Sequence, residues 1–181
     1  MVLLLFSCVT CLPCQRAPER DFTTESLLMD DSMFPPGWKN RPIIPTADSH
    51  GAFEHPMRHV ISERGGDGAV HEIYRYECVN DARQEYKRQL DVLFPETQRY
   101  DEWRPRENLH TALVFADEAY VACANRRLLN GRGITDCRML ARYHEYVVRF
   151  HTEVIPPHLT FEDLGTILRS IDHKFSSAIQ P

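Results

Sequence analysis

The chain has 181 residues, of which 43% are hydrophobic, and its 26 acidic and 21 basic side chains give a formal net charge of −5. This composition excludes a disordered or collagen-like protein, and the acidic balance argues against nucleic-acid binding, which usually goes with a strongly basic domain. The length is typical of one domain that buries a core without the help of a metal.

The first eight residues, 1–8, form a short apolar run that ends in Cys8. The run is far too short to span a bilayer, and it lacks the basic residues that open a secretory signal. We therefore interpret it as a truncated export signal. Leu5-Phe6-Ser7-Cys8 resembles a bacterial lipobox, in which the cysteine is lipidated and becomes the mature N-terminus. The resemblance implies a lipid anchor on Cys8 at the extracytoplasmic face of a cell membrane.

Two other interpretations of the leader remain open. The apolar run also fits a buried N-terminal strand of a cytosolic protein. Alternatively, the spacing of Cys8, Cys11 and Cys14 lets three thiolates converge on a soft metal ion or form a redox site. Zinc sites usually draw their ligands from two separated pairs, and the sequence lacks a second cluster, so the lipid anchor is preferred.

Residues 9–48 are rich in proline, with Pro13, Pro18, Pro35, Pro36, Pro42 and Pro45. Proline removes a backbone donor and favours extended conformations in the residue before it. This segment is therefore predicted to be a tether, with Phe34 and Trp38 packing on the edge of a single folded domain over residues 49–181.

The first half of that domain is predicted to contain a hairpin and a helix. Residues 58–64 and 69–76 are β-prone and flank a Gly/Asp cluster, which is a hairpin signal. A helix is expected from Asn80 or Asp81 to about Phe94, because apolar side chains recur there at helical spacing. Residues 96–108 are polar and are expected to form a long connection.

The second half is predicted to be mostly β-structure. Residues 109–115, 119–127, 137–142 and 146–153 are β-prone. In the last of these strands the apolar side chains alternate with Arg149, His151 and Glu153, so one face of the sheet is expected to be solvated.

A C-terminal helix closes the chain, because Thr160 and Asp163 approximate a capping box before an amphipathic stripe that ends at Ile179. The fold class is therefore α+β: an antiparallel sheet of about five or six strands, with an internal helix and the C-terminal amphipathic helix packed on it.

This order of elements resembles the PsbP/Mog1/LpqN-like fold. The segments 143–150 and 160–175 are similar to the C-terminal part of small bacterial lipoproteins of unknown function. Members of that fold group are mostly accessory or binding proteins, so the resemblance implies binding rather than catalysis. A shared fold does not by itself establish a shared function.

A disulfide is predicted between Cys123 and Cys137, because they flank the Asn130-Gly131 turn on two strands of one hairpin. In an oxidising compartment this bridge closes a loop of about 15 residues and contributes about 3 kcal/mol. The alternative is two buried free thiols. Cys78 is then left unpaired and is expected to be buried rather than reactive.

The histidines and aromatic residues supply weaker candidates for a site. His50, His55, His59 and His71 lie close enough in sequence to suggest zinc, but no carboxylate or cysteine stands at a characteristic ligand spacing, so we predict no metal and no cofactor. Tyr100 and Trp103, in the long connection, are the candidate centre of an exposed binding patch.

No sequence motif of a nucleotide-binding protein, a metalloprotease or a serine hydrolase is found in the chain. The sequence therefore predicts an accessory or interaction module of the cell envelope. It would be anchored to the membrane by lipid, with a possible envelope protein as its partner and no nucleic acid. Two alternatives remain: a hydrolase without a recognisable motif, and a carrier of a metal or small ligand.

Overall fold

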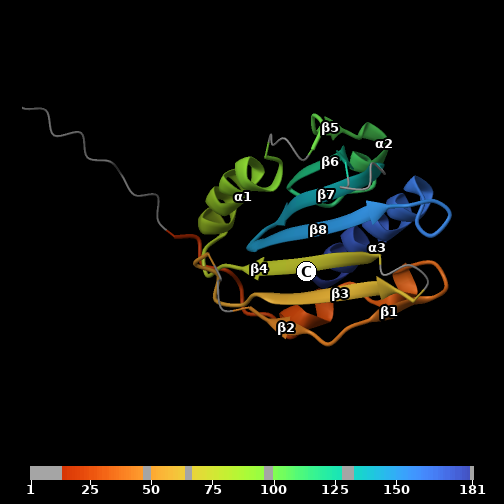
Figure 1. Cartoon of the computed structure of the whole chain (residues 1–181). Coiled ribbons are helices and arrows are strands. Elements are labelled where there is room, and N and C mark those ends of the chain that lie inside the picture. Colours follow the sequence, from red (N-terminus) through yellow and green to blue (C-terminus); the bar gives the residue numbers. More distant parts are fainter. Residues whose placement is uncertain (1–13, 47–49, 64–66, 96–99, 128–132, 180–181) are drawn as a thin grey trace, which may run out of the picture.

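The computed structural model describes residues 14–46, 50–63, 67–95, 100–127 and 133–179 (Figure 1). They form one antiparallel sheet of eight strands together with helices, so the predicted α+β class is confirmed. The expected count of five or six strands was too low. Short edge strands account for the difference, because two-residue and three-residue strands leave no periodic signal in a sequence.

The strands of the sheet follow the order β1-β3-β4-β8-β7-β6-β5, and β2 also pairs with β3. The strands are β1 (Trp38–Asn40), β2 (Ile44–Pro45), β3 (Pro56–Ser62), β4 (Gly68–Arg75), β5 (Arg104–Pro105), β6 (Glu118–Arg127), β7 (Gly133–Tyr143) and β8 (Tyr146–Val154). The helices are α1 (Val79–Leu93), α2 (Glu107–His110) and α3 (Phe161–Ile179), with short 3₁₀ helices η1 (Thr24–Leu27) and η2 (Asp31–Met33).

The helix α3 covers one face of the sheet, which we call the α3 face (Figure 1). As the sequence predicted, Thr160 and Asp163 form a capping box: Thr160 N donates to Asp163 Oδ2 at 2.9 Å, and Asp163 N donates to Thr160 Oγ1 at 3.2 Å. The apolar stripe of the helix, including Phe175, packs in one cluster with Phe150 of β8. This cluster is the main core.

The opposite face, which we call the open face, is covered only in part. Tyr86 and Leu93 of α1 pack there in a second cluster with Leu140 and Val147. The helix α1 therefore shields one end of the β7–β8 pair. The rest of the open face carries a third apolar cluster around Trp103 and several charged side chains.

The segment expected to be a tether is instead part of the folded domain over residues 14–46. Leu27, Leu28 and Met29 are fully buried in the main core, and Phe34 and Trp38 join them. The prolines here lie in loops and an edge strand, where strand pairing does not require their missing backbone N–H group. Their abundance is therefore compatible with a folded segment and does not indicate a tether.

Polar contacts also hold this N-terminal segment to the sheet and to α3. Lys174 Nζ donates to Leu28 O at 2.7 Å, and Arg58 Nη1 donates to Met29 O at 2.8 Å. The guanidinium group of Arg20 makes a two-point contact with the buried Glu145, at 2.8 and 3.0 Å. The segment is therefore fixed by burial, hydrogen bonds and ion pairs together.

The predicted strand over residues 109–115 is wrong. The chain forms α2 and a turn there, and Leu109, Ala112 and Leu113 are buried in the main core. Their spacing of three and four residues is that of a helix, and the β-prone composition of the segment concealed it.

None of the helices in the described part of the chain combines the length and the apolar character needed to cross a bilayer.

Candidate functional site

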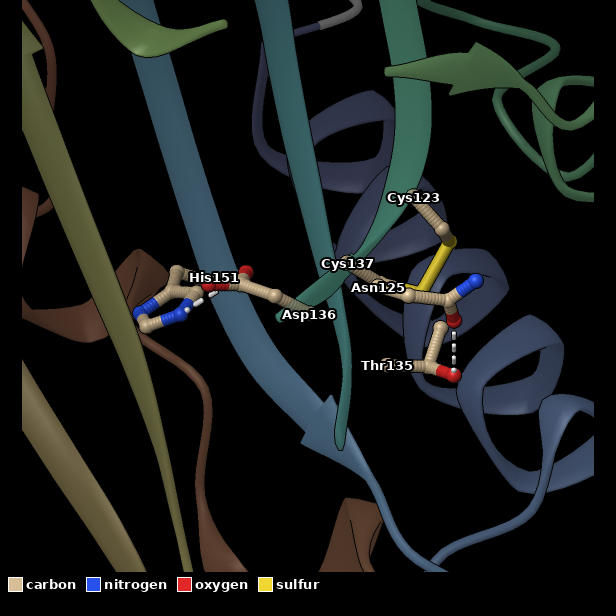
Figure 2. Close-up of a disulfide and its surroundings, with 6 residues drawn as sticks. All are labelled: Cys123, Asn125, Thr135, Asp136, Cys137 and His151. Carbon is tan, nitrogen blue, oxygen red and sulfur yellow. Dashed lines mark hydrogen bonds and ion pairs between the residues drawn. A yellow bond between two sulfur atoms is a disulfide. The ribbon is translucent and has the colours of Figure 1, made fainter. Parts of the chain in front are cut away.

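The disulfide predicted between Cys123 and Cys137 is present, with the two residues directly opposite each other on β6 and β7 and their Cα atoms 4.1 Å apart (Figure 2). Both side chains are buried in the main core. Asn125 and Thr135, two positions further along the same strands, are joined by a side-chain hydrogen bond of 3.1 Å. The disulfide thus fixes the register of this hairpin from the α3 face.

A second disulfide joins Cys14 to Cys78, which lie 64 positions apart in sequence and have Cα atoms 5.5 Å apart. Cys78 is therefore not the unpaired, buried cysteine expected from the sequence. The proposed three-cysteine metal or redox site loses a ligand, because Cys14 is in a disulfide and has no free thiolate. Cys8 and Cys11 lie outside the described residues.

Tyr100 and Trp103 are brought together, with ring centroids 5.1 Å apart. They do not form an exposed patch, because Trp103 is only 8% exposed and packs with Ala122 and Ala124 of β6. Both rings instead contact Arg138, whose guanidinium carbon lies 4.5 Å from the Trp103 centroid and 5.1 Å from that of Tyr100. The two rings therefore pack against the guanidinium group of Arg138 on the open face.

The histidines do not converge on a metal site. His71 is buried toward the α3 face, where its Nδ1 accepts a hydrogen bond of 2.9 Å from Met29 N. His59 pairs with Val70 and so points to the opposite face, while the His55 ring stacks on Tyr74 with centroids 3.7 Å apart. Across the described ranges, no three His, Cys, Asp or Glu side chains are grouped so as to hold a metal ion.

The open face carries a network of charged side chains, and its centre is Asp136 of β7. Asp136 Oδ1 lies 3.0 Å from His151 Nε2, and its Oδ2 accepts a hydrogen bond of 3.0 Å from Tyr100 and lies 3.4 Å from Arg138 Nη2. Figure 2 shows Asp136 turned toward His151 of β8 and away from the disulfide. One nearly buried carboxylate thus accepts hydrogen bonds from Tyr100 and Arg138 and also lies in contact with the His151 ring.

The partners of Asp136 decide its charge. Burial acts to raise the pKa of this carboxyl, but the contact with His151 and the charges of His151 and Arg138 outweigh burial and hold the pKa below its usual range. Asp136 is therefore ionised at neutral pH and can fix the positions of its donors.

A second ionic group lies beside it, where Arg149 of β8 meets β4. Arg149 Nη1 lies 3.1 Å from Glu72 Oε2 and donates to Tyr74 OH at 2.8 Å. Tyr74 OH donates in turn to Glu72 Oε2 at 3.1 Å. Because burial raises the pKa of Tyr74, the hydroxyl keeps its proton and can make this second bond.

Between these two groups the open face is hollowed into a pocket of about 430 Å³, which we call the open-face pocket. Its polar lining comes from His59, Glu72, Arg138, Arg149 and His151. The volume lies within the range of small-molecule sites, which begins near 300 Å³. The alternation in the predicted strand 146–153 placed Arg149 and His151 on a solvated face. It could not indicate the partners that other strands supply to them.

A larger hollow of about 870 Å³ lies between the N-terminal segment and α3. Two of its charged lining residues, Asp30 and Lys174, lie 3.4 Å apart, and Lys174 also donates to the backbone of Leu28. These groups account for the docking of the N-terminal segment. The open-face pocket is therefore the better candidate for a site.

No family model, curated protein or solved structure matches the chain.

Proposed function

We propose that the protein is a lipid-anchored interaction module on the extracytoplasmic side of a cell envelope, attached to the membrane through Cys8. The apolar leader and the lipobox-like Leu5-Phe6-Ser7-Cys8 support the anchor. The resemblance to small lipoproteins of the PsbP/Mog1/LpqN-like fold group supports an accessory role rather than a catalytic one.

The observation that carries this proposal is the pairing of cysteines. All four cysteines in the described part of the chain are in disulfides, Cys14–Cys78 and Cys123–Cys137. Structural disulfides form and persist in oxidising compartments and are rare where thiols are kept reduced. Two of them in one domain therefore favour a location outside the cytoplasm.

The Cys14–Cys78 disulfide also limits how far an anchored domain could lie from the membrane. Cys14 follows Cys8 by six residues, and six fully extended residues reach about 20 Å. The expected tether of some forty residues would have allowed a much longer reach. In this proposal the domain lies directly against the membrane surface.

A small apolar surface supports contact with a protein partner. Val114 and Phe115 are 74% and 49% exposed, and both of their backbone amides donate to the carboxylate of Asp172, which is buried and also accepts from Tyr143 OH at 2.9 Å. The two exposed side chains are therefore presented on a backbone that is already ordered, which lowers the entropic cost of binding.

Membrane fractionation of the full chain tests the anchor. The wild type is expected in the membrane fraction, the Cys8→Ala variant in the soluble fraction, and the matched Cys11→Ala variant in the membrane fraction. A Cys8→Ala protein that stays in the membrane would overturn the anchor. Peptide mapping without reductant tests the compartment in the native host, where free thiols at Cys123 and Cys137 would reject the oxidising location.

A further inference from the structure

The open-face pocket has more positive than negative charge. Arg138 and Arg149 line it together with Glu72, and Glu72 is paired with Arg149. The carboxylate that faces Arg138 belongs to Asp136, which is only 1% exposed and is shared with His151 and Tyr100. The pocket wall therefore presents the guanidinium group of Arg138, while the carboxylate of Asp136 that neutralises it lies beneath the surface.

The two guanidinium groups are held in place before any ligand arrives. Arg138 donates to Leu93 O and to Tyr100 OH, and it stacks on Trp103. Arg149 is held by Tyr74 and Glu72. Because these side chains are already ordered, binding an anion costs little conformational entropy, and planar guanidinium groups match the geometry of a carboxylate.

Part of the same pocket is apolar. Met57 of β3, Val70 of β4 and Leu93 at the end of α1 line it beside the charged groups. A ligand that fills this space therefore needs an apolar body as well as an anionic group.

We propose that the open-face pocket binds a small carboxylate with an apolar body, its carboxylate directed at Arg138 and Arg149 and its body against Met57, Val70 and Leu93. This site is independent of the lipid anchor. It adds a ligand class to the proposed interaction module, and either proposal can fail without the other.

Titration of the full-length protein with octanoate, followed by calorimetry and by backbone amide NMR shifts, tests the site. Octanoate is expected to shift the backbone amide signals of β4, β7 and β8. Octanamide, which has the same chain without the charge, is expected to bind at least about tenfold more weakly than octanoate. Equal affinities for the two compounds, or no octanoate binding at millimolar concentration, would overturn the proposal.

A pair of arginine variants locates the binding. Arg149→Met is expected to weaken octanoate binding about tenfold, whereas Arg169→Met, an exposed arginine on α3, is expected to leave it unchanged. Amide NMR spectra of both variants show whether the fold is retained. Unchanged affinity in a folded Arg149→Met protein, or an equal loss in Arg169→Met, would refute the assignment to this pocket.

Discussion

The two faces of the sheet differ in what they contribute, and adjacent residues of β8 show the difference most directly. Phe150 points into the main core beneath α3, whereas Arg149 points to the open face and lies in an ion pair. Burying one large apolar side chain stabilises a fold by about 1.5–3 kcal/mol. A partly exposed ion pair contributes about 1 kcal/mol or less, because desolvation offsets the attraction.

The side chains that stabilise the fold and the charged groups of the proposed ligand site therefore lie on opposite sides of the same strands. The α3 face is apolar and covered, and its disulfide is buried with it. The open face keeps charged groups in fixed positions and leaves a pocket between them. Variants on the two faces should therefore differ in kind: those on the α3 face change the free energy of unfolding, and those on the open face change binding.

Among the variants, Phe150→Ala should lower the free energy of unfolding the most. Removing this fully buried ring leaves a cavity in the main core, and such substitutions lower the free energy of unfolding by about 3–5 kcal/mol. Urea unfolding monitored by circular dichroism measures the loss. A loss below about 1 kcal/mol would show that the α3 face is not where stability resides.

The double variant Cys123→Ala/Cys137→Ala should come next. Losing the bridge frees a loop of about 15 residues in the unfolded chain, and the free energy of unfolding should fall by about 3 kcal/mol. The matched control is Asn125→Ala/Thr135→Ala, which removes an exposed pair from the same two strands and should change stability by less than about 0.5 kcal/mol. Equal losses in both variants would mean that the disulfide adds nothing beyond an ordinary cross-strand contact.

The features that could be predicted from the sequence are local ones. The alternation in β8, the capping box of Thr160 and Asp163, and the cysteines flanking one turn each involve residues close together in the chain. Each pattern follows from the geometry of a single strand, helix or hairpin. The structure confirms all three.

The features that could not be predicted depend on contacts between distant segments. Leu28 and Met29 are buried in the main core, and their carbonyls accept hydrogen bonds from the distant Lys174 and Arg58. No local pattern distinguishes this segment from a tether. In the candidate site, Arg149 was recognisable as a residue of a solvated face, but its partner Glu72 is supplied by β4. Only the order of strands β4-β8-β7 brings these charges together.

Acid should lower the free energy of unfolding through His71, which is buried on the α3 face. Burial, together with the nearby charges of Lys174 and Arg58, lowers the pKa of His71 to about 3. An unfolded histidine takes up a proton below about pH 6.5, whereas the folded one stays neutral. Protonation therefore stabilises the unfolded state relative to the folded state as the pH falls. Between pH 7 and pH 5 this linkage should reduce the free energy of unfolding by about 2 kcal/mol.

The variant His71→Gln isolates this effect, because a glutamine can still accept the hydrogen bond from Met29 N but does not titrate. Urea unfolding at pH 7 and pH 5 should show a smaller acid loss for the variant than for the wild type. The contribution of Asp30, whose pKa is lowered from 3.8 despite partial burial, appears only at lower pH. The same acid loss in both proteins would assign the sensitivity to other groups.

The smallest expected effect on stability is that of Arg149→Met on the open face. Methionine keeps the apolar part of the side chain, and Glu72, which is partly exposed, can be hydrated while still accepting from Tyr74. The free energy of unfolding should therefore fall by about 1 kcal/mol, against less than about 0.5 kcal/mol for Arg169→Met on α3. A loss of about 3 kcal/mol or more, as for a fully buried ion pair, would show that the open face stabilises the fold as strongly as the core does. A small loss leaves the protein folded, so any change in octanoate binding would then report on the pocket itself.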